Sequence, residues 1–106
     1  MKRPPSFSKR DFERVLRTGT RTRARAGTFY VAPGTDPAIP ARLGLAVPSR
    51  VGGAVLRNRI KRRLRASFVS ASLPAGLDVV VRARPEAATL DFQELESTLS
   101  GLGGVS

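Results

Sequence analysis

The chain has 106 residues, enough for one small domain with a modest core. It carries 19 Lys and Arg against 8 Asp and Glu, a net charge of +11, so we expect a polyanionic partner. The absence of Cys excludes disulfides and thiolate chemistry, and the absence of His removes the commonest general base and metal ligand. No apolar run is long enough to span a membrane and no signal peptide is recognisable, so we expect a cytoplasmic protein with no membrane partner.

The first predicted helix spans Lys9 to Arg17. Ser8 is a suitable N-cap, and Asp11 three residues later makes a near capping box. Phe7 and Phe12 stand at the positions of a hydrophobic staple, which fixes the direction in which the chain enters the helix. The apolar face of this helix is predicted to hold Phe12, Val15 and Leu16.

Three strands are predicted after this helix. Thr28 to Val31 is rich in strand-forming residues, and Pro33 to Pro37 then forms a loop. Arg42 to Val47 alternates large apolar residues with Gly and Ala, and Pro48 ends it. Leu77 to Ala83 contains three consecutive valines and is predicted to be well buried.

The second predicted helix, from Ala54 to Ser70, is strongly basic. From Arg50 to Arg65 the chain has seven positive charges and no acid, which costs stability through repulsion within the helix. Binding to a polyanion would offset that cost. An apolar stripe docks the helix on the body of the protein: Leu56, Ile60, Leu64 and Phe68. The opposite side carries Asn58, Lys61, Arg62 and Arg65.

Two other interpretations of this helix are open. One is a solvated charged face, although ordinary surface helices mix charges of both signs. The other is a helix that lies on a membrane surface. That helix would need a free apolar stripe, whereas the predicted strands need a helix to cover them. The pattern therefore favours binding to a polyanion.

A third helix is predicted after Asp91, which is its N-cap, with Glu94 at the third helical position. Its inner face is predicted to hold Phe92, Leu95, Leu99 and Leu102. The order α-β-β-α-β-α indicates an α+β fold, a mixed α/β sandwich with helices packed on a small central sheet. We expect a single polyanion-binding domain over residues 1–106, with residues 1–7 and 103–106 flexible.

The segment from Val51 to Arg65, VGGAVLRNRIKRRLR, resembles the signature of the bacterial ribonuclease P protein subunit, roughly VGNAVxRNRxKRxxR. The strand LGLAV precedes it, as in the family. The Asp11–Phe12 pair and the strand that leads to Pro85 also fall in the family's order. The resemblance therefore covers nearly the whole chain.

This resemblance implies both a fold and a function. The fold is an α/β sandwich with an unusual left-handed β-α-β crossover. The function is that of the protein subunit of an endoribonuclease, in which a catalytic RNA subunit removes the 5′ leader of precursor tRNA. The RNA holds the Mg²⁺ that it requires. The chain itself is then expected to hold no metal or other cofactor, to supply no catalytic residue and to need no further protein partner.

The resemblance also implies two sets of binding residues. The residues expected to contact the catalytic RNA are Arg50, Arg57, Asn58, Arg59, Lys61, Arg62 and Arg65. The residues expected around a cleft for the single-stranded leader are Phe12, Leu16, Arg25 and Tyr30, with Arg25 at its edge. Aromatic rings suit this cleft because bases stack on them with little regard to sequence.

Three positions depart from the family pattern. Leu16 stands where many members have a second Phe, which removes one stacking surface. Ser49 replaces the first of two Lys and so removes one phosphate contact. Gly53 replaces the Asn before the basic helix, which leaves the start of that helix less defined.

Two other functions fit parts of the sequence. A ribosomal or other small structural RNA-binding protein would have the same size and charge, but would not predict the Arg57–Asn58–Arg59 block in its flanking context. A protein nuclease that acts without RNA would need clustered carboxylates for metal ions or a His general base. The acids here are scattered over the sequence, and His is absent.

Overall fold

The computed structural model describes residues 7–103. The predicted flexible ends, 1–7 and 103–106, lie outside this range except for Phe7 and Gly103. Within it, no helix is long and apolar enough to cross a membrane. The helices and strands in chain order are α1 (Lys9–Thr18), β1 (Thr20–Ala24), β2 (Gly27–Pro33), β3 (Arg42–Ala46), α2 (Ala54–Ala71), β4 (Leu77–Ala83) and α3 (Phe92–Gly103), with the short 3-10 helices η1 (Ser49–Val51) and η2 (Pro85–Ala88).

The three predicted helices and three predicted strands are confirmed, but one strand was missed. β1 forms a hairpin with β2, so the order is α-β-β-β-α-β-α. Its sequence, TRTRA, contains no large apolar residue, and its first four residues are exposed. It is an edge strand held mainly by backbone hydrogen bonds, and a search for hydrophobic alternation cannot find such a strand.

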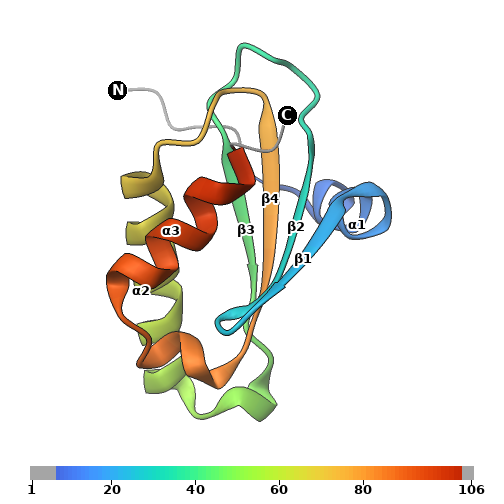
Figure 1. Cartoon of the computed structure of the whole chain (residues 1–106). Coiled ribbons are helices and arrows are strands. Elements are labelled where there is room, and N and C mark those ends of the chain that lie inside the picture. The colour runs from blue at the N-terminus through green and yellow to red at the C-terminus, as the bar shows by residue number, and fades with distance from the viewer. Residues whose placement is uncertain (1–6, 104–106) are drawn as a thin grey trace, which may run out of the picture.

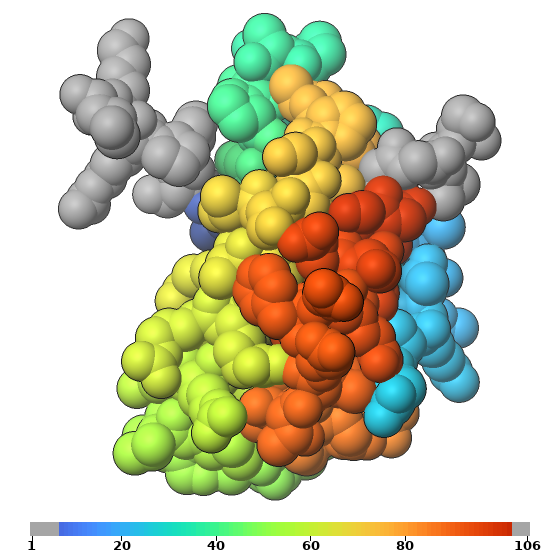
Figure 2. Space-filling view, turned by 60° about the vertical axis from the view of Figure 1, so that its left-hand side comes forward, coloured from blue at the N-terminus to red at the C-terminus, as the bar shows by residue number. Residues whose placement is uncertain are grey.

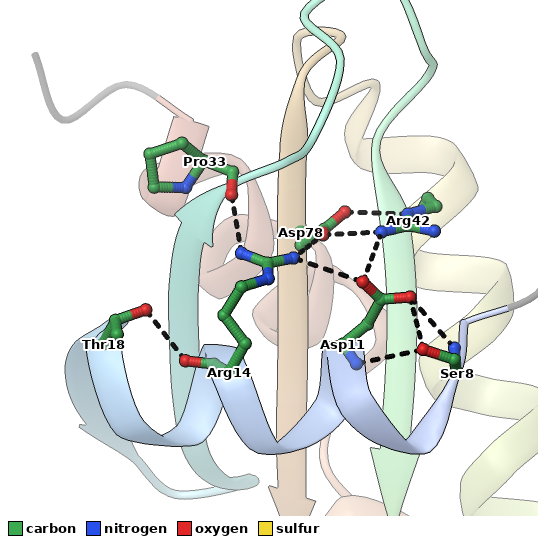
Figure 3. A network of polar contacts seen from close by, with 7 residues as sticks. All are labelled: Ser8, Asp11, Arg14, Thr18, Pro33, Arg42 and Asp78. Carbon is green, nitrogen blue, oxygen red and sulfur yellow. Dashed lines mark hydrogen bonds and ion pairs between the residues drawn. The ribbon is translucent and has the colours of Figure 1, made fainter.

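The four strands form one mixed sheet in the order β1-β2-β4-β3. β2 is antiparallel to both of its neighbours, whereas β3 and β4 are parallel and are joined through α2. Figure 3 views the sheet from the α1 side: β4 lies to the left of β3, both run downward, and α2 passes behind them. This geometry makes the β3-α2-β4 crossover left-handed, as the resemblance implied and against the general rule.

The helices divide between the two faces of the sheet. α2 and α3 cover one face and α1 lies on the other (Figure 1). The main core lies under α2 and α3, where Phe29, Ile60, Leu64, Leu95 and Leu99 are fully buried. A smaller cluster lies under α1 and consists of Val15, Ala32 and Val80. Because α1 has only ten residues, it leaves part of its face of the sheet open.

One core prediction is wrong. Phe92 was expected on the inner face of α3, yet it is 37% exposed, whereas Leu95, Leu99 and Leu102 on the same helix are buried. Helical side chains lean towards the N-terminus of their helix. Phe92 is the first residue of α3, so its ring reaches beyond the end of the buried face.

Candidate RNA-binding surfaces

The outer face of α2 presents four polar residues together. Asn58, Lys61, Arg62 and Arg65 follow helical spacing and, with Val55, line a shallow hollow of about 450 Å³. They face outward because Ile60 and Leu64 on the opposite side are fully buried. Lys61, Arg62 and Arg65 make no ion pair with any of residues 7–103. This face therefore offers positive charge that the fold does not neutralise.

The start of α2 is well defined despite its unusual sequence. Gly53 is the N-cap, in an extended conformation and without a side chain that could cap the helix. Gly52 before it has a φ of +157°, and a Cβ there would lie 2.5 Å from Cδ2 of Leu56. Gly52 thus lets the side chain of Leu56 pack closely against the turn that leads into the basic helix.

The other residues expected to contact RNA are spread around α2. Arg50 is exposed on η1 and lines a hollow on the opposite face of the sheet. Arg57 is half-buried, and its Nε has no hydrogen-bond partner among residues 7–103. Arg59 faces α3, beside Phe92. The residues predicted to contact RNA therefore do not form a single patch. Asn58, Lys61, Arg62 and Arg65 form one compact group, and the other three residues lie around it.

The open part of the sheet on the α1 side forms a hollow of about 670 Å³. Its floor is one row of residues paired across all four strands: Arg23, Thr28, Arg82 and Ala46. Tyr30 lines it from β2, and Arg50 and Arg84 line it from segments beyond the sheet. The small side chains of Thr28 and Ala46 leave room between the arginines. The hollow thus combines one aromatic ring with four guanidinium groups.

Three of the residues predicted for the leader cleft meet on this face. Phe12, Leu16 and Tyr30 are half-buried against the cluster under α1. Of these, Tyr30 is the one that lines the hollow. The ring of Phe12 instead packs edge-on against Phe7, with centroids 6.2 Å apart, as the predicted staple requires.

Gly44 allows this close approach of α1 to the sheet. A Cβ on Gly44 would lie 2.8 Å from the Phe7 ring and 3.0 Å from the Phe12 ring. The absence of a side chain on β3 therefore lets both rings rest directly on the strand. A larger residue there would push the N-terminal part of α1 away from the sheet.

The predicted position of Arg25 is wrong. Arg25 lies in the turn after β1, and its Nη1 is 3.1 Å from Oε1 of Glu94 on α3, so it points away from the hollow. Arg23, two residues earlier, takes the expected place. Sequence reasoning also missed Arg82, although a charge inside the buried strand LDVVVRA was a signal for it. Strand alternation places that charge on the face opposite Val81.

α1 is held on the sheet by a network of charged groups (Figure 3). Asp78 of β4 is buried and accepts hydrogen bonds from Nε and Nη2 of Arg42, at 2.9 and 2.8 Å. Arg14 of α1 donates to the same carboxylate and to the carbonyl of Pro33. Asp11 of α1 pairs with Arg42 at 3.3 Å. The network thus ties α1 to β2, β3 and β4.

This network sets the charge state of its members. Two hydrogen bonds from Ser8, followed by the nearby charge of Arg42, lower the pKa of Asp11 from 3.8 to about 2. The hydrogen bonds to Asp78 raise the pKa of Arg42. Both groups are therefore ionised at neutral pH. Within residues 7–103, no group of three or more acidic side chains is arranged to hold a metal ion.

Comparison with known proteins gives one consistent result. A sequence family described as Ribonuclease P matches residues 7–104. The chain is similar to the ribonuclease P protein component of Acidothermus cellulolyticus, with 41% identity over 89% of this chain and 80% of that protein. It is also similar to that of Beutenbergia cavernae, with 46% identity over 86% and 77%. Among solved structures, the Thermotoga maritima RNase P protein matches with a TM-score of 0.74 and 25% identity over 96% of both chains.

Proposed function

This chain belongs to the ribonuclease P protein family, and we propose that it binds both the catalytic RNA and the 5′ leader of precursor tRNA. Proteins of this family are components of an endoribonuclease complex that has an RNA subunit. In this proposal the RNA subunit and its Mg²⁺ cut the substrate in the cytoplasm. The chain contributes binding, because it has neither His nor Cys and its described residues form no acidic cluster.

The observation that carries the proposal is the presence of two basic surfaces on opposite faces of the sheet. The outer face of α2 surrounds a shallow hollow with three cations and an amide, which suits the phosphates of a folded RNA. The hollow on the α1 side is larger and places Tyr30 among arginines. Stacking combined with backbone contacts is how proteins hold single strands without reading their sequence. One small domain can thus bridge two RNAs.

Such a bridge also predicts how the protein affects the reaction. Two RNAs repel each other, and either Mg²⁺ or fixed cations can reduce that repulsion. The chain alone should leave precursor tRNA intact. Added to its RNA subunit, it should stimulate cleavage most at low Mg²⁺. A stimulation that does not change with Mg²⁺ concentration would contradict this role.

The leader site can be tested with three variants of the assembled ribonucleoprotein. Affinities for precursor tRNA and for mature tRNA are measured across a salt series. Tyr30→Ala should weaken precursor binding by at least about 5-fold through lost stacking, with no change in salt slope. Arg23→Ala should weaken it and also make the slope shallower by somewhat under one unit. Arg25→Ala is the matched control, because that guanidinium pairs with Glu94 and points away from the hollow.

The comparison between the two tRNAs decides the assignment. Mature tRNA lacks the leader, so its affinity should not respond to Tyr30→Ala or to Arg23→Ala. Equal losses for both tRNAs would place these residues against the tRNA body or the catalytic RNA. A loss for Arg25→Ala as large as that for Arg23→Ala would show that general charge, not the hollow, holds the leader.

A further inference from the structure

A separate hollow lies between α2 and the start of α3, two helices that run side by side on this face of the molecule (Figure 2). It has a volume of about 350 Å³, and Phe92, which is 37% exposed, forms its aromatic wall. The remaining lining comes from one stripe of α2: Arg59, Arg62, Arg63 and Ala66. No carboxylate of residues 7–103 lines this hollow.

The three arginines of this hollow differ in how firmly their side chains are held. Arg63 donates from Nε to the carbonyl of Ala87, at 3.1 Å, and from Nη2 to that of Leu90. It therefore fixes the segment that leads into α3 and presents Phe92. Arg59 and Arg62 are exposed and make no ion pair with any of residues 7–103. These two side chains can move to meet a ligand, whereas the backbone segment before the Phe92 ring is held by Arg63.

We propose that Phe92 is a stacking platform for one unpaired base of the RNA that α2 binds, with Arg59 and Arg62 binding the adjoining phosphates. The proposal rests on the proposed binding of RNA by α2. It extends that contact onto α3 and adds a residue that charge alone would not identify. Arg62 lies on the border between this hollow and the one around Asn58, so a single RNA segment can cover both.

A nucleotide fits this site better than a peptide does. An acidic peptide would neutralise the arginines but leave the aromatic ring exposed. An apolar peptide would cover the ring but leave two cations without counter-charge. A nucleotide offers a flat π-face and a phosphate within one residue, and every base can stack on an aromatic ring. The site therefore matches an unpaired nucleotide of any sequence.

Two substitutions of Phe92 separate stacking from packing, and both are assayed for binding to the ribonuclease P RNA subunit. Phe92→Leu keeps an apolar side chain but removes the ring, and should weaken binding by at least about 5-fold at an unchanged melting temperature. Phe92→Trp keeps the ring and should retain the affinity. The natural chain contains no Trp, so the indole of this variant is the sole indole fluorophore, and RNA should quench its emission. Val69→Ala, at an exposed apolar position of α2, is the matched control and should bind as the natural chain does.

The outcomes distinguish this inference from the function on which it rests. Unchanged RNA affinity of Phe92→Leu, or an unquenched indole in Phe92→Trp, would overturn the stacking role. A lower melting temperature of Phe92→Leu with unchanged RNA affinity would assign the ring to packing. If Arg65→Ala still weakened binding in either case, only the stacking inference would fail. If Arg65→Ala also had no effect, binding of RNA by α2 would fail with it.

Discussion

The substitution Asp78→Asn should destabilise the protein although it changes a single atom. The carboxylate of Asp78 is buried, and the Arg42 side chain that it binds is only 9% exposed. Asn keeps one acceptor oxygen, but it replaces the other with an NH2 donor and carries no charge. Arg42 would then remain buried and positively charged, with Asp11 as its only acidic partner among residues 7–103.

The expected loss follows from this burial. Removal of one partner from a buried ion pair costs about 3–5 kcal/mol, since the remaining charge is left without compensation. Asn preserves the shape of the site, so we expect about 3 kcal/mol, the lower end of that range. A domain of this size has a free energy of unfolding of about 5–15 kcal/mol. The melting temperature should fall by roughly 12 °C or more, at about 4–8 °C per kcal/mol.

Denaturant unfolding at neutral pH measures this loss. Asp36→Asn is the control, because Asp36 lies in an exposed loop and its Oδ1 accepts a hydrogen bond from the backbone N–H of Ala38, which Asn can also accept. In an Arg42→Met background the loss from Asp78→Asn should shrink, because the guanidinium that depended most on Asp78 is gone. Equal losses in both backgrounds, or a loss no larger than that of Asp36→Asn, would refute the argument from an unpaired buried charge.

Two further predictions concern α2 and α1. Leu64→Ala should cost about 2–5 kcal/mol of unfolding free energy because Leu64 is fully buried. Arg65→Ala should leave the melting temperature unchanged and weaken RNA binding. A comparable loss of stability in both variants would mean that Arg65 stabilises the fold. The lowered pKa of Asp11 should contribute about 1 kcal/mol after solvent screening. That contribution should be complete above about pH 5 and lost progressively as the pH falls through both pKa values to about pH 1, so Asp11→Asn should be less stable than the natural chain at pH 7, and the difference should disappear near pH 1.

Periodicity in the sequence was sufficient for most of the fold. The three helices and three of the four strands have strong signals, because each buries a face with the spacing of its secondary structure. Ser8 and Asp11 fixed the start of α1 through local hydrogen bonds that any chain of this sequence can make. β1 escaped prediction because its partners are backbone groups of β2, and its own side chains are exposed.

The candidate site was predicted less completely, for a related reason. Residues on one helix, such as Asn58 and Arg65, share a face by spacing alone, so the α2 group followed from the sequence. The hollow on the sheet requires the order of the strands, because Arg23 and Arg82 meet only when β2 lies between β1 and β4. Arg25 was misplaced because its partner, Glu94, lies 69 residues away along the chain.

The arginines of this chain become informative once their partners are known. Arg14 and Arg42 are held by Asp78, and Arg63 is held by backbone carbonyls, so these three stabilise the fold. Six of the arginines without an ion pair among residues 7–103 lie on two surfaces: Arg59, Arg62 and Arg65 on α2, and Arg23, Arg50 and Arg82 around the sheet hollow. Repulsion within each group opposes folding, and bound phosphate removes it. RNA binding and stability of the domain should therefore increase together.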